Sequence, residues 1–81
     1  MGKYDPWREH LLRADADQVK MSFAELEALA PLPPSARKHA AWWSNEDADS
    51  TTHSQCKAWI SAGYRARPDL ASGEVKFIRA K

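Results

Sequence analysis

The sequence predicts an α+β domain with three or four short helices and a small antiparallel sheet that ends in a C-terminal β-hairpin. Three features lead to this prediction: an amphipathic helix pattern near the N-terminus, a very short strand pattern before a second helix, and alternating apolar and polar side chains within residues 64–79. The order helix, strand, helices, hairpin is the connectivity of winged helix-turn-helix domains. In those domains the short strand pairs with the terminal hairpin, and we expect the same pairing here.

Length and composition limit the possible classes. The chain has 81 residues, and we expect a single domain over residues 1–81. Charged residues make up 28% and hydrophobic residues 43%, values typical of a globular protein rather than a disordered one. The single cysteine, Cys56, excludes an intramolecular disulfide framework. No apolar run is long enough for a membrane span or a signal peptide, so we expect a cytoplasmic protein that does not bind membranes.

The first helix is expected over residues 5–13. Asp5 is a suitable N-cap residue, and Pro6 suits the first helical position because its missing N–H is not needed there. Trp7 and Leu11 are four residues apart, which places them on one face of the helix. We expect that face to be buried.

A short strand over residues 18–21 and a helix over residues 23–30 follow. Apolar and polar side chains alternate in the strand, which is the period of a half-buried strand. Ser22 and Glu25 form a capping-box pattern at the start of the helix, in which each side chain bonds the backbone N–H of the other. A proline-rich segment then ends the helix, since proline disfavours helical continuation.

Two more helices and a hairpin complete the prediction. A short helix is expected over residues 35–43, and a helix over residues 53–62 closes at Gly63, a preferred residue just past a helix end. The polar, acidic segment between these helices is expected to be a loop, with Asn45 capping the end of the earlier helix. Residues 64–79 then form the hairpin, in which alternating side chains face opposite sides of the sheet.

The sequence resembles a small bacterial domain family of unknown function. The runs that carry the resemblance are KYDPWREHL (3–11), SFAELE (22–27), LPPSARKH (32–39), AWWSN (41–45) and AWISAGY (58–64). They match the family pattern KYDPLREHL, SFAEIE, LPxSAR, WWxN, AWLxAGW and a final VxFxR, with Trp7, Ile60 and Tyr64 as mild departures. The resemblance covers nearly the whole chain and implies no particular chemistry.

We do not expect a catalytic or metal site. Cys56 lies in the middle of an apolar helix pattern, where a buried structural thiol is more common than a nucleophile. The three histidines and the cysteine lack the spacings of zinc sites, and the three glycines form no phosphate-binding loop. No catalytic residue, metal or cofactor is therefore assigned, and the protein is expected not to be an enzyme.

The charge distribution suggests a polyanionic partner. Residues 1–49 hold six Lys/Arg and nine Asp/Glu, a net charge of −3, whereas residues 50–81 hold six and two, a net charge of +4. We therefore expect a small DNA-binding protein, regulatory or architectural, whose partner is double-stranded DNA. Its contacts would come from a helix start, a polar helix face and the basic hairpin. The candidate residues are Ser35, Arg37, Lys38, His39, His53, Gln55, Lys57, Arg65, Arg67, Lys76 and Arg79.

Most of the tryptophans are expected in the core, whereas an exposed aromatic ring would favour an alternative function. We expect at least three of the four tryptophans to fill the core. Because Trp42 and Trp43 are neighbours on a helix, one should remain partly exposed, so Trp42, Trp43 and Tyr64 are possible exposed aromatic contacts. The alternative function is a protein-interaction module, such as an inhibitor, an adaptor or an accessory protein of a mobile-element or defence system. Its interface would use an exposed tryptophan, Tyr4 or Tyr64 and the acidic residues 46–49; either function allows a monomer or a homodimer.

Overall fold

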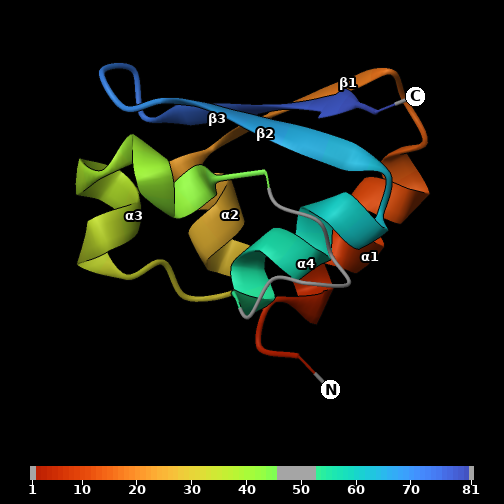
Figure 1. Ribbon diagram of the computed structural model, residues 1–81, viewed down its shortest axis with the longest axis horizontal. Coiled ribbons are helices and arrows are strands. Elements are labelled where there is room, and N and C mark those ends of the chain that lie inside the picture. Colours follow the sequence, from red (N-terminus) through yellow and green to blue (C-terminus); the bar gives the residue numbers. More distant parts are fainter. Residues whose placement is uncertain (1, 46–52, 81) are drawn as a thin grey trace.

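A computed structural model describes residues 2–45 and 53–80. Its elements, in chain order, are α1 (Asp5–Ala14), β1 (Gln18–Ser22), α2 (Phe23–Leu29), α3 (Pro34–Lys38), the 3₁₀ helix η1 (Ala40–Trp43), α4 (Ser54–Ser61), β2 (Tyr64–Asp69) and β3 (Glu74–Arg79). Figure 1 shows two layers, with the sheet on one side and the helices packed beneath it. The predicted α+β class, with its short helices and terminal hairpin, is confirmed.

The sheet has three antiparallel strands in the order β1-β3-β2. β3 is the central strand, and the early strand β1 pairs with it as the winged-helix connectivity predicted. Val75 and Phe77 of β3 face the helices and are wholly buried, whereas Lys76 between them is exposed. The alternation read from the sequence therefore separates an inner, core-facing side of the sheet from an outer side that faces solvent.

The two N-terminal helices begin differently: α2 has a side-chain cap, whereas the N-cap residue of α1 makes no capping hydrogen bond with its side chain. α1 starts with Asp5 and Pro6 inside its first turn, and its N-cap residue is Tyr4 rather than Asp5. The predicted capping box of α2 is present: Glu25 N–H donates to Ser22 Oγ at 3.0 Å, and Ser22 N–H donates to Glu25 Oε1 at 3.0 Å. The hydrogen bond from the Ser22 backbone N–H to the carboxylate is the main reason why the pKa of the Glu25 carboxyl is lowered, because it stabilises the charged form; the Ser22 hydroxyl contributes in the same direction.

The prediction of a single helix over residues 35–43 is wrong. His39 has an extended backbone, with φ −126° and ψ 116°, and divides the segment into α3 and η1. The break changes the direction in which the following tryptophans point. As a result Trp43 enters the core and its Nε1 donates to the carbonyl of Ala36 at 2.8 Å, which a continuous helix would have kept for its own ladder.

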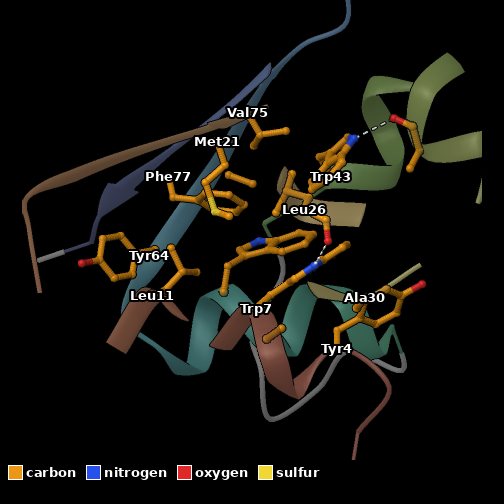
Figure 2. Close-up of a cluster of buried hydrophobic side chains, with 14 of the residues drawn as sticks. Tyr4, Trp7, Leu11, Met21, Leu26, Ala30, Trp43, Tyr64, Val75 and Phe77 are labelled. Atoms are coloured by element: carbon orange, nitrogen blue, oxygen red, sulfur yellow. Dashed lines mark hydrogen bonds between the residues drawn. The ribbon is translucent and has the colours of Figure 1, made fainter. Parts of the chain in front are cut away.

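Aromatic rings fill the centre of the core (Figure 2). Trp7, Trp43 and Trp59 are each at most 1% exposed, so the prediction that at least three tryptophans are buried is confirmed. The Trp43 ring lies 5.9 Å from Trp7 and 5.5 Å from Trp59, centroid to centroid. The buried Trp7 Nε1 donates to the carbonyl of Leu26 at 2.8 Å, which avoids the cost of an unpaired buried donor.

The Asn45 side chain connects the end of the η1 segment to the outer strand β2. Its Oδ1 accepts hydrogen bonds from the Ala66 N–H at 2.7 Å and from Trp59 Nε1 at 3.1 Å. Its Nδ2 donates to the Ala66 carbonyl at 2.9 Å. Asn45 thus satisfies both backbone groups of one residue on a sheet edge, and the predicted role as a helix cap is wrong.

The end of α4 matches its sequence signal. Gly63 has φ +90°, a conformation that side chains rarely adopt, and its N–H donates to the carbonyl of Ile60 at 3.0 Å. The glycine therefore turns the chain from α4 directly into β2. Residues 46–52, which include the predicted acidic loop, lie outside the described residues.

Candidate nucleic-acid interface

The outer side of the sheet carries the largest set of the predicted basic residues. Nine side chains alternate onto it, and the strand register arranges them in three rows across β1, β3 and β2. The rows are Gln18–Ile78–Arg65, Lys20–Lys76–Arg67 and Ser22–Glu74–Asp69. The helices lie on the other side of the sheet, so no described helix covers this face (Figure 1).

The middle row consists of three cations, and we call Lys20, Lys76 and Arg67 the basic row. Lys76 on the central strand is directly opposite both of the others. Side chains directly opposite one another in an antiparallel pair are about 5 Å apart at Cβ, and like charges in such pairs are destabilising. All three side chains are exposed. The free protein therefore carries a repulsion that a bound anion would relieve.

The row beside the basic row is partly acidic. Glu74 and Asp69 are directly opposite each other, and a hollow of about 340 Å³ is lined by these two carboxylates and the basic row. Glu74 approaches Lys20 at 3.8 Å, a long contact between side chains that are 39% and 59% exposed. Such an exposed pair contributes little energy, so it neutralises Lys20 only weakly.

The structure brings together Arg65, Arg67 and Lys76 from the predicted site. It adds Lys20, which the sequence analysis did not include. The signal for Lys20 is present in the sequence, because Val19 and Met21 alternate around it and so direct it to the opposite face. What the sequence does not provide is the register that places Lys20 opposite Lys76.

Arg79, another predicted contact residue, has a structural role. Its guanidinium pairs with Asp15 at 2.9 Å, donates to the Ala16 carbonyl at 3.1 Å and lies 5.5 Å from the centre of the Tyr64 ring. The hydrogen bond to Asp15 raises the pKa of this guanidinium. Tyr64 Oη completes the cluster by accepting from Ala16 N–H at 3.1 Å and donating to the Ala16 carbonyl at 2.6 Å. These contacts hold the α1–β1 connection against the end of β3.

The other predicted contact residues lie on the helical layer, apart from the basic row. Ser35, Lys38 and His39 are exposed at α3, where Arg37 pairs with Glu27 and lies 5.5 Å from the Phe23 ring centre. His53, just before α4, and Lys57 on this helix are exposed. Gln55 is half-buried, and its amide donates to the Trp42 carbonyl at 3.4 Å. Lys57 lines a groove between α1 and α4 together with Asp5 and Arg8. The structure therefore places the candidates on three separate surfaces.

The aromatic contacts required by the alternative function are mostly buried. Tyr64 and Tyr4 are 2% and 5% exposed, so the expectation that they offer exposed rings is wrong. Trp43 is 1% exposed and Trp42 is partly exposed, as expected for one of these two neighbours. Trp42 is half-buried, and its ring lies 4.7 Å from that of Trp43 and 5.9 Å from that of Tyr4. The rings fill the core because a domain of this size has few other large apolar side chains to bury.

Within residues 2–45 and 53–80, no group of three or more His, Cys, Asp or Glu side chains could hold a metal ion. Among the same residues, no helix is long and apolar enough to cross a membrane. Cys56 is buried, as expected for a structural thiol in α4.

Comparison with known proteins identifies one family. Its model, described as a domain of unknown function (DUF7662), matches residues 4–81. No curated protein and no solved structure matched the chain. The match extends over nearly the whole sequence, in agreement with the resemblance read from its motifs. The chain therefore belongs to the DUF7662 family of domains of unknown function.

Proposed function

We propose that this protein is a non-catalytic DNA-binding domain, regulatory or architectural in role, that contacts the phosphates of double-stranded DNA with the outer side of its sheet. The observation that supports this proposal is the basic row across all three strands, Lys20–Lys76–Arg67. Arg65 lies on the same face two residues from Arg67, and adds a fourth cation. Clustered Lys and Arg side chains are the usual partners of the DNA backbone.

The energetics of the basic row favour an anionic ligand. Lys76 has a cation on each side, and both pairs repel in the free protein. A phosphate bound over the row would attract all three side chains and so offset their mutual repulsion. Binding surfaces often lower the stability of the free protein in this way, because their charges are compensated only when the ligand is bound.

The same face favours a duplex over a single strand. Proteins that bind single strands stack successive bases on aromatic side chains. None of the nine described side chains on the outer side of the sheet is aromatic. The described rings are instead packed in the core, with Trp42 half-buried beside it. A face rich in cations and poor in rings fits a continuous phosphate backbone better than unstacked bases.

The test is fluorescence anisotropy with a random-sequence 20-base-pair duplex at 50 and 200 mM salt. With about three phosphate contacts, one from each residue of the basic row, the logarithm of affinity should fall with a slope near −2.7 against the logarithm of salt concentration. A fourfold rise in salt should then weaken binding about fortyfold. We expect Arg67→Gln to reduce the slope by about 1, since it removes one phosphate contact.

Lys57→Gln provides the matched control, because it removes one exposed charge from α4 on the helical layer. It should leave both affinity and slope unchanged. A larger loss of DNA affinity for Lys57→Gln than for Arg67→Gln would indicate that DNA binds at α4 instead. Absence of binding at tens of micromolar protein would reject DNA as the ligand and favour the protein-interaction module.

A further inference from the structure

We infer that the row Gln18–Ile78–Arg65 reads base edges in the major groove, while the basic row beside it contacts phosphates. This inference rests on the proposed function and deepens it, because it names the residues that determine sequence preference. We call Gln18, Ile78 and Arg65 the reading row.

The position of Ile78 is the first reason. It lies on the central strand, directly opposite both Gln18 and Arg65, on the side of the sheet that faces away from the helices. It is half-buried, but it does not belong to the hydrophobic core or to the apolar side chains packed against it. A large β-branched side chain on the solvent-facing, charged side of the sheet adds nothing to the hydrophobic core. Contact with an apolar group of a ligand would give it a role.

The chemistry of the three side chains is the second reason. In the major groove, Gln pairs with adenine through two hydrogen bonds, Arg pairs with guanine in the same way, and apolar side chains contact the thymine methyl group. The reading row has one member of each kind, side by side on three strands. The basic row, in contrast, contains only cations, which suit phosphates.

The dimensions of the sheet agree with this assignment. Neighbouring strands are about 4.8 Å apart, so the outer members of one row start about 10 Å from each other. The major groove is about 12 Å wide and 8.5 Å deep, and its edges are phosphate backbones. The reading row can therefore face base edges while long side chains of the adjacent row reach a backbone.

The third row restricts where the DNA lies. Glu74 and Asp69 are directly opposite each other at the far side of the basic row. Their charges repel phosphates, so a duplex is displaced from that end of the face and toward the reading row. The order of the three rows, acidic, basic and reading, defines one direction of approach.

Two substitutions on the same strand test the inference. Arg65 and Arg67 are both exposed on β2, and Arg→Gln removes one charge at either position. A preferred duplex is first selected with the unmodified protein from a pool randomised over 10 base pairs. Its affinity is then compared with that of a scrambled duplex for each variant. Arg65→Gln should reduce the ratio of the two affinities about tenfold or more, as expected for the loss of one guanine contact.

Arg67→Gln should weaken both duplexes to the same extent, leave the ratio unchanged and lower the salt slope by about 1. Ile78→Ala should reduce the ratio as well, with no change in slope, because it carries no charge. Equal affinity of the unmodified protein for all sequences would overturn the reading row and leave DNA binding intact. A ratio that Arg65→Gln does not change would also overturn it, whereas the absence of any binding would overturn the proposed function itself.

Discussion

Replacing Asn45 with alanine is expected to lower the free energy of unfolding by about 3 kcal/mol. The substitution removes three hydrogen bonds, two to the backbone of Ala66 and one from the Nε1 of Trp59, whose side chain is fully buried. Each polar group that loses its partner in a buried position costs about 1–3 kcal/mol, and partial access of water reduces the total. The expected fall in Tm is roughly 12–24 °C, measured by circular dichroism.

Ser44→Ala, one position earlier in the chain, is the control and should change stability by less than about 0.5 kcal/mol. In a Trp59→Phe background, Asn45→Ala should cost about 1 kcal/mol less, because the indole donor is already absent. A loss below about 1 kcal/mol for Asn45→Ala in the unmodified protein would contradict its role as the connection between the η1 segment and β2.

Lys76→Glu is expected to abolish most DNA binding without lowering stability. The new carboxylate is directly opposite Lys20 and Arg67, so it converts two repulsive pairs into attractive ones, each worth about 0.2–1 kcal/mol. The same change removes one phosphate contact and partly neutralises two others. We expect affinity for duplex DNA at 50 mM salt to fall about a hundredfold, measured by anisotropy, while urea denaturation shows an equal or higher free energy of unfolding.

Lys57→Glu carries the same charge change on the helical layer and should bind DNA with less than a threefold loss. The combination expected for Lys76→Glu, weaker binding with undiminished stability, distinguishes a binding residue from a structural one. Equal binding losses for the two variants would indicate a general effect of net charge rather than a site on the sheet. A Lys76→Glu protein that unfolds more readily would show that the basic row is not repulsive.

Local sequence signals predicted much of this fold. The alternation in residues 64–79, the Ser22–Glu25 capping box and Gly63 each depend on neighbours in the chain, and each has the expected structure. The same alternation predicted that neighbouring side chains of the hairpin face opposite sides of the sheet, as Val75 and Lys76 do. Periodic sequence patterns predict structure because, within one helix or strand, the backbone geometry determines which side chains lie on the same face.

Features that depend on tertiary contacts could not be predicted. The interruption at His39 lets the Trp43 side chain enter the core, and a helical pattern in the sequence does not reveal that preference. The sequence suggested that Arg79 is one of the DNA-contacting cations of the hairpin. In the structure it pairs with Asp15, which lies 64 positions earlier in the chain. The same limitation applies to Lys20, whose neighbours in the basic row come from the far end of the sequence.

The most direct test of the proposed interface is a titration of ¹⁵N-labelled protein with a 16-base-pair duplex, followed by NMR. We predict that the largest chemical-shift changes occur at the amides of β1, β2 and β3 around Lys20, Lys76 and Arg67. The amides of α3 and α4 should change little, because those helices lie on the other side of the sheet (Figure 1). Large changes confined to α3 or α4, with the strand amides unaffected, would contradict a DNA-binding site on the outer side of the sheet.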